Sequence, residues 1–133
     1  METEKEKLLF KAAVKARDNS YSPYSKFKVG AAILTESGNI YSGCNVENCS
    51  FGATICAERT AILKAVSEEG KVIIKKVVVV TEPQAEPCGM CLQVIAEFAC
   101  PECIVLLCDS KNVLKRMSFE DFLPNPFDPS KLP

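Results

Sequence analysis

The sequence predicts an α/β/α sandwich, in which a mixed β-sheet lies between two layers of helices. Val77 to Val80 form a continuous β-branched run, which is typical of a strand whose two faces are both covered. A helical segment and a second apolar strand follow and complete a strand–helix–strand unit, for which a right-handed crossover is expected. With 133 residues, 47% of them apolar, the chain is predicted to form one domain over residues 1–133.

A helix and a hairpin are predicted in the N-terminal third of the chain. Thr3 and Glu6 have the spacing of a capping box, and the helix is expected to run to about Asp18. Residues 28–35 form an apolar strand that returns through residues 40–41 after a Ser-Gly-Asn turn. The apolar face of the helix is expected to consist of Leu8, Leu9, Ala12, Ala13 and Ala16.

Two more helices and two more strands are predicted after the hairpin and the valine run. Apolar residues recur at helical spacing over residues 57–70, and the glycine at the end of that segment favours a stop. A proline precedes the next helix, at about residues 88–99, and an apolar strand follows over residues 104–108. A short strand at 113–117 and a brief helix within 118–124 complete the predicted fold.

Composition argues against several classes of function. The net charge is −1 and no basic run stands out, so a nucleic-acid partner is not expected and a small-molecule substrate is. No stretch of about 18 apolar residues and no targeting pattern is found, so we expect no membrane association and a cytoplasmic location. The eight cysteines are then expected to be metal ligands or buried thiols. Histidine is absent, which removes the usual general base.

Cys56-Ala57-Glu58, followed by Pro87-Cys88-Gly89-Met90-Cys91, predicts a catalytic zinc site. Cys56 and Cys88 start different predicted helices, and the free N–H groups and positive ends of both helices favour the thiolate form that binds metal. A structural zinc usually has four protein ligands, whereas a hydrolytic zinc keeps its fourth position for water. Three cysteines and a spare glutamate fit the second kind, with one zinc ion per chain.

Glu58 and Arg59 are expected to support this site. Glu58 lies two residues beyond Cys56, where it can take a proton from the water and hand it to a leaving group. The plainer alternative for a Cys-x-Glu is a solvated helix glutamate, but the downstream Pro-Cys-x-x-Cys favours the catalytic role. Arg59 is expected to donate hydrogen bonds to the thiolates and to offset their charge.

Cys100 and Cys103 make a second Cys-x-x-Cys pair, so a four-cysteine site with Cys88 and Cys91 is an alternative. Only eight residues separate Cys91 from Cys100, fewer than the 15 to 20 common in such sites. If these residues are helical, the two pairs lie about 13 Å apart, too far to share one ion. The cysteines outside the zinc motif are therefore expected to be buried apolar thiols: Cys44, Cys49, Cys100, Cys103 and Cys108.

With these residues the chain resembles the cytidine deaminases, specifically the small homotetrameric zinc-dependent type within the cytidine/deoxycytidylate deaminase superfamily. The resemblance covers nearly the whole chain and implies a cytidine deaminase-like fold, a homotetramer and a nucleoside substrate. Five motifs in the family's order are far more specific than any one of them. They are Tyr24 to Ala32, Gly43 to Asn48, Cys56 to Ala61, Pro87 to Cys91, and Leu123-Pro124 with Phe127.

The resemblance also implies roles in substrate binding. Asn45 and Glu47 would hold the ribose hydroxyls, Phe27 would pack against the nucleoside, and the Ala57 backbone with Glu58 would recognise the pyrimidine edge. Two polar side chains two residues apart on an extended segment point to the same side, which suits a grip on a diol. Without the resemblance, a solvated loop is the simpler interpretation of Asn45 and Glu47, and core packing that of Phe27.

Phe51 and Phe127 are implied to lie near the active site of a neighbouring subunit, so that catalysis would need the oligomer. Leu92 stands where many members of the family have arginine, which leaves more of the charge compensation to Arg59. Phe51 stands where an aromatic hydroxyl is common, which removes one hydrogen bond and keeps an aromatic wall. Neither departure touches a metal ligand or the proton shuttle.

Together with the site residues, the resemblance implies an enzyme that hydrolytically deaminates cytidine and deoxycytidine to the uridine products with release of ammonia, as in pyrimidine salvage. The nearest rival is a deaminase of another cytosine nucleoside such as blasticidin S, although Phe27, Asn45 and Glu47 favour ordinary nucleosides. No basic or aromatic track favours a polynucleotide deaminase. A rival of another class is a catalytically inert, zinc-stabilised interaction protein, against which the unligated carboxylate of Glu58 argues.

Overall fold

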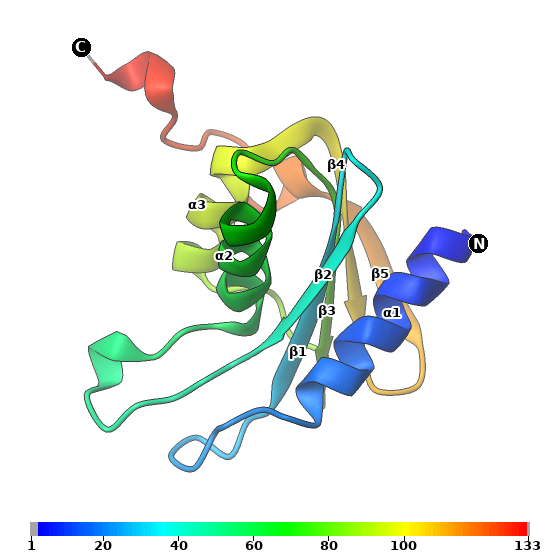
Figure 1. Cartoon of the computed structure of the whole chain (residues 1–133), viewed down its shortest axis with the longest axis vertical. Helices are drawn as coiled ribbons and strands as arrows, with labels where there is room; N and C mark the ends of the chain where they lie inside the picture. Colours follow the sequence, from blue (N-terminus) through cyan, green and yellow to red (C-terminus); the bar gives the residue numbers. More distant parts are fainter. Residues whose placement is uncertain (1–2, 133) are drawn as a thin grey trace.

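The computed structural model describes residues 3–132, which contain a five-stranded mixed sheet in the order β2-β1-β3-β4-β5 (Figure 1). β1 runs antiparallel to both β2 and β3, β3 runs parallel to β4, and β4 runs antiparallel to β5. The valine run therefore lies in the central strand, as predicted. The strands are β1 (Val29–Thr35), β2 (Ile40–Cys44), β3 (Ile74–Thr81), β4 (Ala99–Cys108) and β5 (Val113–Ser118).

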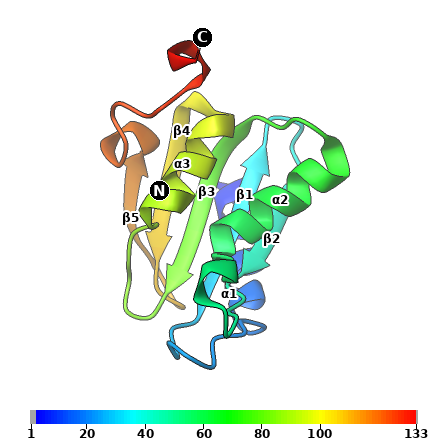
Figure 2. The same ribbon diagram turned by 90° about the vertical axis from the view of Figure 1, so that its left-hand side faces the viewer.

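Helices cover both faces of the sheet. α1 lies on one face, and α2 and α3 lie together on the other, as Figures 1 and 2 show. This arrangement confirms the predicted α/β/α sandwich. Within residues 3–132, none of the helices has the length and apolar character needed to cross a membrane. The helices are α1 (Glu4–Arg17), α2 (Ala57–Glu69) and α3 (Gly89–Phe98), with short 3-10 segments η1 (Phe51–Ala53), η2 (Phe119–Asp121) and η3 (Pro129–Lys131).

The core has two parts, one on each side of the sheet, and β3 contributes to both. Val77 and Val79 belong to the cluster that contains residues of α2 and α3, whereas Val78 and Val80 belong to the cluster that contains residues of α1. Alternate side chains of a strand point to opposite faces, which explains the division. Full burial of each valine contributes roughly 1.5–3 kcal/mol to folding. The central strand is thus fixed from both sides.

Two glycines allow the helices to approach the sheet closely. A Cβ atom at Gly43 would lie 2.7 Å from the backbone nitrogen of Ala61 and 2.8 Å from the carbonyl oxygen of Ala57, both in α2. At Gly30, a Cβ atom would lie 2.0 Å from the carbonyl oxygen of Ala13 in α1. Any larger residue at Gly43 would push α2 away from β2, together with the residues at the start of that helix.

Only one half of the predicted capping box is present. Thr3 accepts a hydrogen bond from the backbone N–H of Glu6 at 3.1 Å, as predicted. The carboxylate of Glu6 does not return to Thr3; it is fully buried and pairs with Lys76 at 2.6 Å and Arg116 at 2.5 Å. An unpaired buried carboxylate costs more free energy than a missing second cap at a helix end, so the side chain of Glu6 pairs with the two cations instead.

Three other expectations need correction. Of the predicted apolar face of α1, only Leu9 and Ala13 are buried, and Leu8 is 51% exposed. β4 begins at Ala99, directly after α3, so Cys100 and Cys103 lie in a strand. Cys49 is exposed in the loop before η1, whereas Cys103 and Cys108 are buried as predicted and Cys44 and Cys100 are half-buried. The expectation of a buried thiol at Cys49 was therefore wrong.

Candidate active site and metal centre

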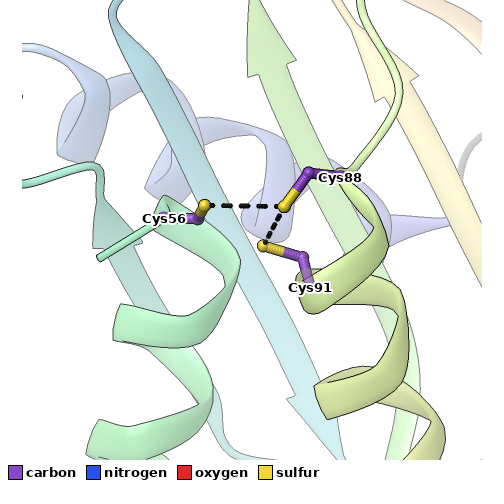
Figure 3. Close-up of side chains that lie close together, drawn as sticks. All are labelled: Cys56, Cys88 and Cys91. Carbon is purple, nitrogen blue, oxygen red and sulfur yellow. Dashed lines mark hydrogen bonds between the residues drawn. The ribbon is translucent and has the colours of Figure 1, made fainter. Parts of the chain in front are cut away.

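Three cysteine sulfurs meet where α2 and α3 begin. Cys56 is the N-cap residue of α2, Cys88 is the N-cap residue of α3, and Cys91 lies in the first turn of α3. Figure 3 shows their side chains pointing toward one another, with Sγ–Sγ distances of 3.8 Å from Cys56 to Cys88 and 3.5 Å from Cys88 to Cys91. All three sulfurs lie within 4.8 Å of one another.

These separations fit a zinc ion. Zinc–sulfur bonds of about 2.3 Å in a tetrahedron place the sulfurs about 3.8 Å apart, close to the distances observed. Among the described residues, this trio is the one cluster of three or more cysteine, histidine or acidic groups with metal-ligand spacing. Cys100 and Cys103 are not part of it. Three protein ligands leave the fourth position open for water or substrate, as in a catalytic site.

The surroundings of Cys56 favour its thiolate. Hydrogen bonding with Cys91 and with Arg59 lowers the pKa of Cys56 to about 5, although burial opposes the change. The guanidinium of Arg59 donates to the sulfur at 3.5 Å and to the carbonyl oxygen of Thr54 at 3.3 Å. Hydrogen bonding to Cys56 and burial raise the pKa of Cys91. A bound dication would take the place of the thiol protons, because metal binds cysteine as thiolate.

Glu58 lies in the first turn of α2 with its side chain turned inward, and the residue is only 4% exposed. Burial, together with the charge of Cys56, raises the pKa of Glu58 to about 7. The alternative of a solvated helix glutamate is thereby excluded. A buried carboxyl that exchanges its proton near neutral pH is suited to general acid–base chemistry.

A cavity of about 290 Å³ brings most of the predicted site residues together. Phe27, Asn45 and Glu47 line one part of it, and residues from the starts of α2 and α3 line another. The second group consists of Cys56, Ala57, Glu58 and Cys88. The ring of Phe27 borders the cavity and the residue is 36% exposed, so it does not belong to the core. Side chains from residues 25 to 88 of the sequence thus converge on one cavity, which Cys56 and Cys88 also line.

The side chains of Asn45 and Glu47 hold the loop that precedes β1. Asn45 Oδ1 accepts from the N–H of Val29 at 2.9 Å and from the hydroxyl of Ser20, and its Nδ2 donates to the carbonyl oxygen of Phe27 at 2.8 Å. Asn45 and Glu47 also line the cavity, so each residue both stabilises the loop and faces the space that a ligand would occupy.

Glu47 uses both carboxylate oxygens in this loop. Oε1 accepts from the backbone N–H groups of Tyr24 at 2.9 Å and Ser25 at 3.1 Å, and Oε2 accepts from the Ser25 hydroxyl. The Ser25 hydroxyl is the main reason that the pKa of Glu47 is lowered. The carboxylate is therefore ionised at neutral pH and fixed in direction.

Phe51 and Phe127 lie outside this cavity. Phe51 is 74% exposed and packs edge to face against Tyr24, with ring centroids 5.7 Å apart. Phe127 is 60% exposed, and its carbonyl oxygen accepts from Gln93 at 2.8 Å. Leu92 packs beside the core on the α2 and α3 face. Neither phenylalanine is among the residues that line the cavity with Cys56 and Cys88.

Sequence reasoning missed several residues of the cavity, among them Ser25, Thr54, Thr81 and Glu86. Thr81 is buried and ends β3, and ligand sites of α/β folds gather at the carboxyl ends of strands. That position was a usable signal. Ser25 lies within a motif that the resemblance includes, but no chemistry distinguishes it from the hydroxyl of a turn. Only the folded loop brings it to Glu47.

Comparisons with known proteins agree with this geometry. A family model described as "Cytidine and deoxycytidylate deaminase zinc-binding region" matches residues 3–107. The chain is 48% identical over 120 residues to a cytidine deaminase of Sporosarcina psychrophila, covering 89% of this chain and 88% of that protein. It is also 34% identical to a blasticidin-S deaminase of Bacillus cereus, covering 75% and 76% of the two chains.

Its fold is similar to the crystal structure of cytidine deaminase from Burkholderia pseudomallei. The TM-score is 0.84 and the sequence identity is 38%, with 95% of this chain and 100% of that chain covered. The order of strands and the placement of helices on both faces therefore have a close counterpart in an experimental structure.

Proposed function

Since the chain belongs to the cytidine and deoxycytidylate deaminase family, we propose that it is a zinc-dependent cytidine deaminase. It converts cytidine and deoxycytidine to uridine and deoxyuridine, using water and releasing ammonia. The observation that carries this proposal is the buried carboxyl of Glu58, which shares a cavity with the sulfurs of Cys56 and Cys88. A site kept only for stability has no use for an unligated carboxyl at that place.

Cys56, Cys88 and Cys91 would hold the zinc, which when bound supplies a Lewis acid that lowers the pKa of water. Glu58 takes the proton of the attacking water and returns it through its carboxyl to the departing amine, so that ammonia leaves and a carbonyl forms. Arg59 offsets part of the negative charge of the three thiolates through its contact with Cys56. The backbone of Ala57 lines the cavity beside Glu58 and is assigned to the pyrimidine edge.

The free hydrogen-bonding capacity of Asn45 and Glu47 supports binding of one sugar hydroxyl. A carboxylate offers about four lone-pair positions and an amide two N–H donors. Glu47 accepts three hydrogen bonds within the protein, which leaves one acceptor position, and Asn45 donates one, which leaves one N–H. A single hydroxyl can donate to the first and accept from the second. The second hydroxyl of ribose is then not required, which favours both cytidine and deoxycytidine.

The charges around the cavity favour a nucleoside over a nucleotide. Glu47, Glu58 and Glu86 line it, and among the described residues no lysine or arginine does. A phosphate group would meet carboxylates without a compensating cation. A volume of about 290 Å³ lies at the lower end for small-molecule sites, which suits one nucleoside and disfavours a polynucleotide. Phe27 supplies the apolar wall against which the nucleoside packs.

We further propose that the chain forms one catalytic domain and assembles as a homotetramer in the cytoplasm, in a pathway of pyrimidine salvage. Phe51 and Phe127 are exposed aromatic residues that do not line the cavity of their own chain. Large exposed aromatic side chains are typical of interfaces. Their placement supports contacts near the site of a neighbouring subunit.

A test of the reaction compares Glu58→Gln with Glu68→Gln. Glu68 is an exposed glutamate of the same helix and serves as the matched control. Glu58→Gln is expected to keep its zinc and to lose at least about 100-fold in cytidine turnover, because the proton carrier is removed. Glu68→Gln is expected to behave as the wild type. Near-normal turnover by Glu58→Gln would refute the assigned role.

The similarity to a blasticidin-S deaminase makes that nucleoside the second substrate to assay. Turnover of blasticidin S without turnover of cytidine would favour the alternative activity. A folded, zinc-loaded protein that acts on neither nucleoside would favour the interaction protein.

A further inference from the structure

Lys26 has a left-handed backbone conformation, with φ of 61°. Among the described residues it is the one non-glycine residue with a positive φ. A Cβ atom makes this conformation unfavourable, and it persists where surrounding contacts enforce it, often at functional sites. Lys26 lies between Ser25 and Phe27, which both line the cavity. The strained residue therefore joins two residues of the site.

The hydroxyl of Ser25 holds this conformation from one side. Its Oγ accepts a hydrogen bond from the backbone N–H of Phe27 at 3.0 Å, across Lys26. The same hydroxyl donates its proton to the carboxylate of Glu47. On the other side, Asn45 Nδ2 donates to the carbonyl oxygen of Phe27 at 2.8 Å. Both backbone polar groups of Phe27 are thus fixed by side chains of the site.

We propose that Ser25 is a positioning residue, whose hydroxyl couples the carboxylate of Glu47 to the backbone of Phe27. The group assigned to the sugar and the aromatic wall assigned to the base are then held at one separation. The inference rests on the proposed function, because that function assigns these two roles. Sites held by such supporting hydrogen bonds lose performance when the support is removed, even if every contacting group remains.

The coupling affects binding rather than the chemical step. Cys56, Cys88 and Glu58 lie at the starts of α2 and α3, and no hydrogen bond of Ser25 reaches either helix among the described contacts. Removal of the hydroxyl is therefore expected to raise KM and to leave kcat and zinc content nearly unchanged. If Ser25 had only a structural role in the loop, its removal would lower the stability of the protein without raising KM selectively over kcat.

The experiment compares Ser25→Ala, Ser25→Thr and Ser22→Ala, with cytidine as the substrate. Ser25→Ala is expected to raise KM about tenfold or more, the size expected for a lost hydrogen bond to a charged group, with kcat within about twofold. Ser25→Thr keeps the hydroxyl and is expected to restore KM. Ser22 lies in the same loop, and among the described side chains its hydroxyl contacts that of Ser20 and no residue of the cavity, so Ser22→Ala is expected to match the wild type.

Amide hydrogen exchange gives a readout that needs no activity. In Ser25→Ala the N–H of Phe27 is expected to exchange at least about tenfold faster, while that of Val29, which Asn45 holds, stays unchanged. Either an unchanged KM or an unchanged exchange rate at Phe27 would overturn the coupling. Equal impairment of Ser25→Ala and Ser25→Thr would overturn it too, because shape rather than the hydroxyl would then matter.

These results separate the coupling from the proposed function. A wild-type protein that binds zinc but does not deaminate cytidine refutes the function, and Phe27 exchange in Ser25→Ala then decides the positioning by itself. A wild type that deaminates cytidine, together with a Ser25→Ala variant of normal KM, refutes the coupling and leaves the function in place.

Discussion

Replacement of Gly43 by alanine tests whether the close packing of α2 against β2 sets the geometry of the metal site. The new Cβ atom would lie 2.7 Å from the nitrogen of Ala61, where ordinary contact begins at 3.4 Å. Helix and strand must therefore separate by about 0.7 Å, the difference between the two distances. Cys56 precedes the first residue of that helix, so the shift moves its sulfur relative to Cys88, now 3.8 Å away.

The expected result is a loss of both stability and zinc affinity. Overpacking costs about 1–3 kcal/mol of unfolding free energy, and displaced ligands lower metal affinity by roughly 10–100-fold. Stability is measured by urea denaturation, and affinity by competition with a chromophoric chelator at fixed pH. Both are measured for the wild type, Gly43→Ala and two control variants.

The controls separate general damage from damage to the site. Gly30→Ala places a Cβ atom 2.0 Å from the carbonyl oxygen of Ala13 in α1, on the other face of the sheet, so it should lose stability and keep its zinc affinity within about threefold. Gly52→Ala meets no atom within 4 Å and should change neither. If Gly43→Ala lost stability yet bound zinc as tightly as the wild type does, the reasoning would be refuted.

Three more outcomes are expected. Hydrogen bonds from Arg116 and Lys76 outweigh burial and lower the pKa of Glu6 from 4.5 to about 2. The ionised carboxylate therefore contributes roughly 1–3 kcal/mol to the free energy of unfolding, in full above pH 4.5, and this contribution is lost as the pH falls from 4.5 to 2. Denaturation measured across this pH range should show the loss in the wild type and not in Glu6→Gln. Tyr41→Phe removes the 2.6 Å hydrogen bond to Glu69 and should cost about 1–2 kcal/mol by denaturant titration. Removal of zinc by a chelator should abolish cytidine turnover and lower the Tm, and added zinc should restore both.

The fold was predictable where neighbouring residues determine local structure. The valine run identifies the central strand, and the glycine at position 70, with φ of 79°, ends α2 as predicted. Glu6 shows the limit of such reasoning, because its partners lie 70 and 110 residues away in the sequence. A helix pattern shows that Glu6 is near a helix start but not that a sheet will cover it.

The site was predictable to the same extent. Cysteine spacing and the carboxylate beside Cys56 indicate the metal centre, because metal geometry restricts the choice of residues. The roles of Ser25 and Lys26 depend on a left-handed turn and on a contact 22 residues along the chain. Neither residue type requires such a conformation. Positioning contacts of this kind become visible only in the folded loop.

The two outer strands of the sheet limit how copies of the protein can associate. β2 and β5 each have one unpaired side, which in many proteins invites strand addition and aggregation. On β2, the ammonium of Lys64 donates to the carbonyl oxygen of Ser42 at 2.5 Å, and on β5 Lys115 and Arg116 are exposed. Charged side chains thus lie at both outer strands, which disfavours the addition of a strand from another copy and the growth of a continuous intermolecular sheet.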